Sequence, residues 1–281
     1  MNIKILVASH KPGYVYFDDI YTPIQVGKEL SPYNIENMIG DNTGDNISTK
    51  NPMYCELTAL YWAWKNLKGI DYIGLCHYRR YFDFHKQIPS YSPHTYLKTK
   101  DIESINYSIP LKVTKELKDG KIIISKHQTG RESLYTQYCL KHISDDLRTL
   151  QETVKSETDP RYIQAFKKVM RNNKFSPYNM FIMPWPEFEK YCTWLFSILK
   201  NVEAKIDTSH YNNIQKRIYG YMAERLINIY IEANNLKTKE YPIISFIDDD
   251  SYKNVSRFEY YTKTFIKNIA FHFTLPPFEV E

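Results

Sequence analysis

The sequence has 281 residues, 43% of them hydrophobic, which allows one large domain with a sizeable core and excludes a largely disordered chain. The formal net charge of +5 suits a protein that handles anionic ligands, and it is too small to indicate nucleic-acid binding. The 4 cysteines lie far apart without a CxxC pair, which predicts free thiols rather than disulfides or a zinc site.

The first half of the chain predicts strands around one helix. The apolar run "IKILVAS", residues 3–9, is typical of a central parallel strand, and because no charged region with a cleavable apolar segment comes before it we expect no signal peptide. A loop rich in Gly, Asn and Asp over residues 40–46 leads into a helix predicted over 51–67, which opens with an Asn-Pro pair suited to a helix start. The stretch "DYIGLCHYRRYF", residues 71–82, predicts another strand.

The second half predicts mainly helices. The runs "KIIIS" (121–125) and "YNMFIMP" (178–184) predict strands. Helices are predicted over most of 131–172, with a break at "TDPRY", and over 185–206 and 214–235. We therefore expect an α/β fold with a mostly parallel central sheet flanked by helices, as one domain over 1–281 whose residues 255–281 form a helical extension.

The run "DYIGLC", residues 71–76 of the second predicted strand, leads into the first candidate site. His77, Arg79 and Arg80 would lie at its carboxyl end, where open α/β sheets bind ligands. Guanidinium groups match phosphate oxygens and stay charged. Because side chains alternate along a strand, we expect one arginine on the ligand and one in a structural role. Pairing of both with surface carboxylates is the alternative.

The loop over residues 40–46 is a second candidate. Asp41 and Asp45 could bind a hard cation, contact a ribose, or simply form turns. The loop lacks the spacing of an EF-hand and the lysine of a phosphate-binding loop.

Charged residues later in the chain leave alternatives open. Glu224 lies beside Arg225 in an otherwise apolar helix, so it is either a positioned general base or part of a solvated face. Asp248 and Asp250 resemble the Asp-x-Asp metal motif of sugar transferases. They lie late in the chain, after the predicted strands of the sheet, where that motif is not expected, and we interpret them as part of a loop.

Two further segments each have a functional interpretation and a purely structural one. His127, Tyr138 and His142 could line an acceptor groove or be ordinary surface residues. The stretch 255–273 has apolar residues at helical spacing with Lys263 and Lys267 between them, which fits a membrane-surface helix or a helix packed on the domain.

Taken together, the blocks "IGDNTGDNIS", "ALYWAWKN", "HYRRYF", "YNMFIM" and "ER" resemble a bacterial family, domain-of-unknown-function family 4422, from about Ile3 to Tyr241. This family occurs in capsule, exopolysaccharide and O-antigen synthesis. It looks like glycosyltransferases of the GT-A fold, and some relatives are implicated in transferring galactofuranose from UDP-galactofuranose.

The resemblance implies a nucleotide site. The first strand and its loop would hold the nucleotide, and "HYRR" takes the place of the usual metal motif, so arginine with His77 would neutralise the diphosphate without a metal or another cofactor. Asn179 would contact the sugar, and Glu224 would be the catalytic base. Asp41, a second catalytic candidate, and Asp45 would contact the donor sugar or ribose. The nucleotide contacts implied at the first strand are Ser9, His10 and Lys11.

The resemblance therefore implies a UDP-sugar-dependent transferase that extends a lipid-linked glycan at the inner face of the plasma membrane, on which it would be peripheral. No nucleic-acid partner is expected. A non-catalytic carbohydrate-binding or scaffold protein of the same polysaccharide assembly system is the alternative.

Overall fold

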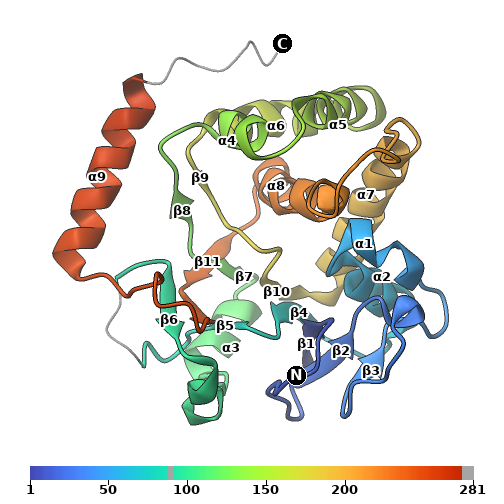
Figure 1. The fold of residues 1–281 in the computed structure, drawn as a ribbon, viewed down its shortest axis with the longest axis vertical. Helices are drawn as coiled ribbons and strands as arrows, with labels where there is room; N and C mark the ends of the chain where they lie inside the picture. Colours follow the sequence, from blue (N-terminus) through green and yellow to red (C-terminus); the bar gives the residue numbers. More distant parts are fainter. Residues whose placement is uncertain (88–90, 274–281) are drawn as a thin grey trace.

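A central sheet organises the molecule (Figure 1). The computed structural model describes residues 1–87 and 91–273, and within these residues the strands form a ten-stranded sheet and a two-stranded ribbon. The main path of the sheet is β11 (Thr238–Tyr241), β7 (Ile122–Ser125), β10 (Phe181–Pro184), β4 (Tyr72–His77), β1 (Ile3–Ser9), β2 (Tyr21–Gln25) and β3 (Ile39–Gly40).

Most neighbouring strands in this path run parallel. β1 pairs in parallel with β2 and β4, and β10 is inserted antiparallel between β4 and β7. The interior of β1 is almost wholly buried, as expected for a strand covered on both faces. The carboxyl ends of β1, β2 and β4 therefore meet at one edge of the sheet, and the predicted α/β fold with a mostly parallel sheet is confirmed.

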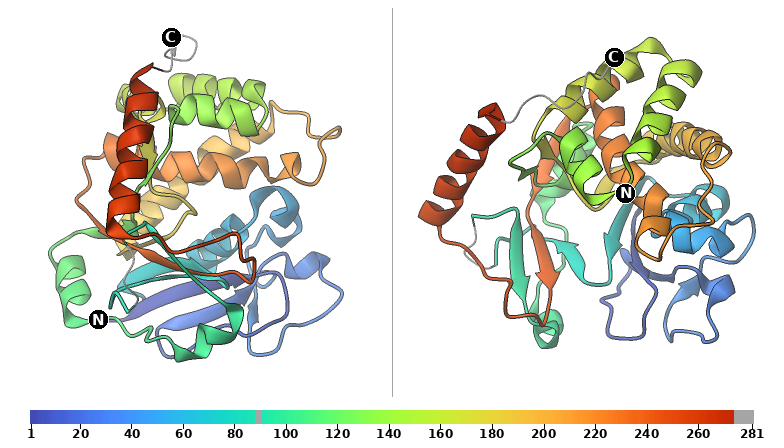
Figure 2. Two further views of the ribbon diagram at one scale, coloured as in Figure 1. Left: turned by 60° about the vertical axis from the view of Figure 1, so that its left-hand side comes forward. Right: turned by 45° about the horizontal axis from the view of Figure 1, so that its top comes forward.

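Helices cover one face of the sheet (Figures 1 and 2). The long helices α7 (Trp185–Glu203) and α8 (Ile218–Ala233) share one apolar cluster with α2 (Leu57–Asn66) and the sheet. Helix α5 (Ser144–Glu157) packs on α7 and α8, helix α6 (Pro160–Arg171) packs on α8, and helix α4 (Leu134–Lys141) packs on α5 and α6. Helices α5 and α6 are separated at Thr158–Asp159, where the sequence predicts a break.

The opposite face carries a smaller layer. Helix α3 (Leu111–Lys118) contributes apolar residues to a second cluster there. A side arm of the sheet completes this layer, in which β12 (Ile243–Phe246) pairs with β5 (Arg80–Phe82) and β6 (His94–Leu97). The two-stranded ribbon pairs β8 (Gln128–Thr129) with β9 (Lys174–Phe175).

Three segments differ from the sequence predictions. The helix predicted over 51–67 is broken at Cys55, whose φ is 51°, into α1 (Asn51–Tyr54) and α2. The strand predicted over 71–82 is two strands, β4 and β5, which reverse direction between His77 and Arg80. The strand predicted over 178–184 begins only at Phe181. In each segment an apolar or aromatic run continues through a break or turn of the backbone, so the local sequence pattern does not indicate where the element ends.

Helix α9 (Arg257–Phe273) stands at the edge of the molecule (Figures 1 and 2). No residue of this described helix is buried, and Asn268 on it accepts a hydrogen bond from Asn173 at 3.1 Å. The described helices include none that is long and apolar enough to cross a membrane. Residues 274–281 of the extension predicted over 255–281 lie outside the described residues.

Asp41 fixes the loops at the ends of β2 and β3. Its carboxylate is fully buried, and it accepts hydrogen bonds from the backbone N–H groups of Gly27 (2.8 Å) and Lys28 (3.0 Å) and from the Ser48 hydroxyl (2.5 Å). Asp45, four residues on, is exposed and accepts from the Tyr61 hydroxyl at 3.2 Å.

We predict that Asp41→Ala lowers the free energy of unfolding by roughly 2–4 kcal/mol, because it leaves buried donors without an acceptor. Asp45→Ala is the matched control and should change it by at most ~0.5 kcal/mol. Urea denaturation of the purified variants measures both values. Equal stabilities for the two variants would contradict this role of Asp41.

Candidate functional site

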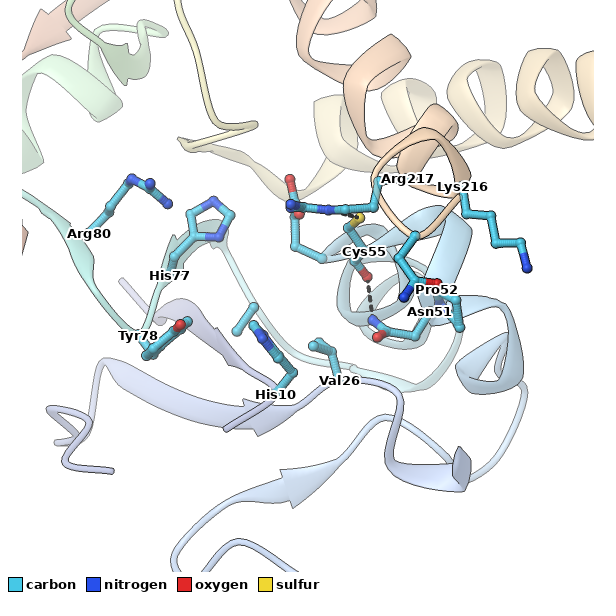
Figure 3. Close-up of a pocket in the computed structure, with 13 residues that line it drawn as sticks. His10, Val26, Asn51, Pro52, Cys55, His77, Tyr78, Arg80, Lys216 and Arg217 are labelled. Atoms are coloured by element: carbon cyan, nitrogen blue, oxygen red, sulfur yellow. Dashed lines mark hydrogen bonds between the residues drawn. The ribbon is translucent and has the colours of Figure 1, made fainter. Parts of the chain in front are cut away.

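A cavity of about 510 Å³ opens at the carboxyl ends of β1, β2 and β4 (Figure 3). Its position agrees with the general location of ligand sites in open α/β sheets. The lining residues come from strand ends, from the α1–α2 junction and from the turn before α8. They are Ala8, His10, Val26, Asn51, Pro52, Cys55, Glu56, His77, Tyr78, Arg80, Asn213, Lys216 and Arg217.

The sheet side of the cavity is formed where β1 and β4 end. Ser9 is fully buried, and its hydroxyl donates to the backbone carbonyl of Lys11 at 2.9 Å, which turns the chain after β1. His10 then lines the cavity edge-to-face against Tyr78, with ring centroids 5.6 Å apart. Burial lowers the pKa of His10, and the neighbouring cations Lys11 and Arg217 add to this effect.

His77 is held in one orientation. Its Nε2 lies 2.7 Å from the carbonyl oxygen of Tyr178. Because a carbonyl oxygen can only accept, Nε2 carries the proton, and Nδ1 is left as an acceptor. Burial lowers the pKa of His77, although the nearby carboxylate of Glu56 acts in the opposite direction. The ring is therefore neutral at physiological pH.

The two arginines after β4 occupy different places. Arg80 lines the cavity, and its guanidinium lies 4.3 Å from the centre of the Tyr178 ring. Arg79 is exposed beside the ring of Tyr78, at 5.1 Å from its centre. Their different surroundings arise because the chain reverses between β4 and β5, rather than from alternation along one strand.

The opposite side of the cavity joins α1 to the turn before α8 (Figure 3). Arg217 Nε donates to Cys55 Sγ at 3.4 Å, which links residues 162 positions apart. Burial raises the pKa of Cys55 to about 11, with the carboxylate of Glu56 adding to the effect, so the thiol is neutral at pH 7. Lys216 lies beside Arg217 and completes this basic wall.

The turn at Tyr178 and Asn179 connects the parts of the site. Both residues have left-handed backbones, with φ of 73° and 54°. The Tyr178 N–H donates to Glu224 Oε1 at 3.2 Å, and the Asn179 amide donates to Glu56 Oε1 at 2.7 Å. With the Tyr178 carbonyl on His77, this turn orients two carboxylates and one imidazole. Left-handed non-glycine residues are uncommon and cluster at functional sites.

Glu224 lies beside this turn. Its Oε2 accepts from Arg225 at 3.0 Å, and its side chain is 21% exposed whereas that of Arg225 is 3% exposed. Burial raises the pKa of Glu224. Arg225 acts in the opposite direction, and the nearby carboxylate of Glu56 raises the pKa further. The Glu224 carboxylate is therefore fixed in position, and it is a stronger base than a glutamate carboxylate in water.

The structure brings some predicted residues together and separates others. His10, His77 and Arg80 line the cavity, and Glu224 is joined to its edge through Tyr178. Asn179 is fully buried behind Glu56. The contacts with a ligand that the sequence predicts for all of these residues stay predictions.

The remaining candidates lie elsewhere. Asp41 and Asp45 are in loops outside the cavity lining, and His127 pairs with Glu240 at 2.6 Å. Tyr138 is buried against His142, whose pKa burial lowers to about 4.

Among the charged and thiol-bearing residues of the cavity, sequence reasoning missed four: Cys55, Glu56, Lys216 and Arg217. The glutamate lies within a segment predicted as one continuous helix, and the basic pair has the pattern of an ordinary helix start. A carboxylate immediately before the apolar run "LTALYWAW" was the one available signal for Glu56.

Within residues 1–87 and 91–273, no group of three or more His, Cys, Asp or Glu side chains is placed to hold a metal ion. This leaves the expectation of metal-free donor binding untested, and it stays a prediction.

Comparison with known proteins places the chain in a family. Residues 4–235 match the model of the domain of unknown function DUF4422, and the chain belongs to this family. The apo structure of the WbbM bifunctional glycosyltransferase is similar, with 33% sequence identity and a TM-score of 0.79. The match covers 88% of this chain and 46% of that chain, so this chain spans about half the length of that protein. No curated protein matches the sequence.

Proposed function

We propose that the protein is a glycosyltransferase that uses a UDP-sugar as donor. The observation that carries this proposal is the cavity at the strand ends, in which Arg80, Lys216 and Arg217 lie with the carboxylate of Glu56. Cations suit a diphosphate, and a carboxylate suits sugar hydroxyls. The similarity to a structure described as a bifunctional glycosyltransferase supports the same activity.

The cationic residues would stabilise the leaving group. When the bond from the anomeric carbon to the donor oxygen breaks, the electron pair leaves with UDP and negative charge grows on its β-phosphate. Arg80 and Arg217 approach the cavity from opposite sides and stay charged at all working pH values (Figure 3). Fixed cations in a partly enclosed site stabilise such charge without reorganisation, which supports transfer without a divalent metal.

UDP binding should therefore survive EDTA and depend on Arg80. We predict that Arg80→Ala weakens UDP binding roughly tenfold or more, because it removes a charge-assisted contact worth ~1.5–3 kcal/mol. Arg79→Ala, which removes the neighbouring exposed guanidinium, is the matched control and should have a smaller effect. Isothermal titration with UDP, with and without EDTA, measures both.

Loss of binding in EDTA that manganese restores would contradict the metal-free mode. Absence of UDP binding in the wild type, together with carbohydrate binding, would favour a non-catalytic role in polysaccharide assembly.

Glu224 would act as the general base. In this mechanism its carboxylate takes the proton of the acceptor hydroxyl while that oxygen bonds to the anomeric carbon, and the bond to UDP breaks. Burial and the neighbouring Glu56 raise the pKa of Glu224, which strengthens it as a base. The N–H of Tyr178 and the guanidinium of Arg225 hold the carboxylate in place.

We predict that Glu224→Gln lowers kcat by at least ~100-fold and leaves UDP affinity nearly unchanged, because a general base contributes to the transition state. Glu56→Gln removes a neighbouring negative charge and so lowers the pKa of Glu224. The acidic limb of the kcat–pH profile should then move to lower pH in Glu56→Gln. Full activity of Glu224→Gln would exclude it as the base, and an unmoved limb would exclude its coupling to Glu56.

The donor and acceptor complete the proposal. We propose galactofuranose as the transferred sugar and a lipid-linked surface polysaccharide as the acceptor, as the family resemblance implies. A lipid-linked acceptor requires access to a membrane surface, and helix α9 provides a suitable element. Its outward residues Phe258, Phe265 and Phe273 are 81%, 66% and 83% exposed. Four basic residues and one acidic residue lie in 253–273, which favours an anionic surface.

We predict that Phe258→Glu with Phe265→Glu weakens binding to phosphatidylglycerol vesicles at least ~10-fold, because it places two charges on the apolar face. The control pair Leu111→Glu with Leu140→Glu changes two equally exposed apolar residues on other helices. Vesicle sedimentation of folded protein measures the difference. Equal vesicle binding by the two double variants would show that α9 is not the membrane contact.

A further inference from the structure

A second cavity of about 360 Å³ lies under helix α9, between that helix and the β6 side of the sheet. We call it the α9 groove. The residues that matter for its chemistry are aromatic, amide and basic: His94, Tyr96, Gln128, Tyr252, Lys263 and Lys267. Neither the predicted donor site nor the predicted acceptor residues include it.

One wall of the α9 groove is a set of aromatic rings. His94 and Tyr96 stack with centroids 5.7 Å apart and planes 10° apart, and Tyr252 lies 5.2 Å from Tyr96. Asn254 fixes the loop that carries Tyr252, because its side chain accepts from the Tyr96 N–H (2.7 Å) and donates to the Tyr96 carbonyl (2.9 Å). Such rings combine an apolar face with a polar edge, which suits the faces and hydroxyls of sugars.

The facing wall is basic. Lys263 and Lys267 line the groove from consecutive turns of α9. Glu259 pairs with Lys263 at 2.6 Å and so offsets part of its charge. Burial lowers the pKa of Lys267, and the nearby cations Arg131 and Lys263 add to this. The carboxylate of Glu132 acts in the opposite direction but does not outweigh these effects, so the ammonium group has more positive than negative charge around it. An anionic ligand would supply the compensating negative charge.

The α9 groove adjoins the donor cavity through one side chain. The Tyr178 ring contacts Arg80 of the donor cavity at 4.3 Å. Its other contacts are with the groove: His94 lies edge-to-face at 5.3 Å, and the Gln128 amide donates to its hydroxyl at 3.4 Å. The backbone N–H of the same residue holds Glu224. Tyr178 therefore lies between Arg80 of the donor cavity and two residues of the groove, and its backbone contacts the proposed base.

We propose that the α9 groove binds the acceptor as a phosphorylated glycan, with sugar rings on Tyr96 and Tyr252 and phosphate oxygens on Lys263 and Lys267. The proposal rests on the proposed function and deepens it by assigning the acceptor a site. It also explains why the two faces of α9 differ: the inner face carries lysines and the outer face carries phenylalanines.

The test measures binding of defined probes to the full chain. A galactosyl diphosphate with a short alkyl chain is the acceptor probe. Three further probes test its chemical groups one at a time: octyl galactoside for the sugar, inorganic pyrophosphate for the diphosphate, and phosphatidylglycerol vesicles for a lipid headgroup. Lys263→Ala with Lys267→Ala should weaken binding of the galactosyl diphosphate at least ~10-fold, equal to ~1.4 kcal/mol. Tyr252→Ala should weaken binding of both galactosyl probes. UDP affinity should not change in any variant.

The control pair Lys155→Ala with Lys200→Ala removes two exposed lysines of α5 and α7 and should bind every probe like the wild type. Wild-type protein that binds UDP but neither galactosyl probe would overturn the proposal while leaving the proposed function standing. Lysine-dependent binding of vesicles or pyrophosphate alone would also overturn it, because the lysines would then recognise a headgroup or free phosphate. Failure to bind UDP would instead count against the proposed function.

Discussion

The turn at Tyr178 and Asn179 is the constraint on which the site depends. Its left-handed backbone places an N–H, a carbonyl and an amide side chain where they meet Glu224, His77 and Glu56. These three groups come from α8, β4 and the α1–α2 junction, which are far apart in the sequence. A strand continuing through the turn would direct those donors and acceptors to the neighbouring strands instead.

The electrostatics of the site follow from this arrangement. Histidines near the cavity are held neutral by burial, so its permanent positive charge comes from arginine and lysine. Arg80 is stabilised by the face of Tyr178, a contact that does not neutralise it. Glu56 and Glu224 provide the opposing negative groups, and the charge of Glu56 raises the pKa of Glu224. The cavity therefore combines fixed cations with one carboxylate, which fits the proposed transfer from a nucleotide sugar.

Sequence reasoning could predict what depends on local pattern. Buried strands such as 3–9 and 121–125 are continuous apolar runs, and the strand-end rule directs attention to His77 and Arg80. Sequence reasoning could not predict the turn at 178–179, because "YNMFIM" has the composition of a strand. The positive φ values of Tyr178 and Asn179 depend on partners that are distant in the sequence. Glu56 was missed for a related reason: its role depends on Asn179, 123 residues away.

Tyr178 also explains how one residue can organise two cavities. Its backbone is used for positioning, and its ring separates the donor cavity from the α9 groove. The Tyr178 side chain is held by Arg80 on one side and by His94 and Gln128 on the other. The unusual backbone at this position is therefore linked to the geometry of the whole site, and its strain is offset by contacts from five separate elements, β4, β5, β6, β8 and α8.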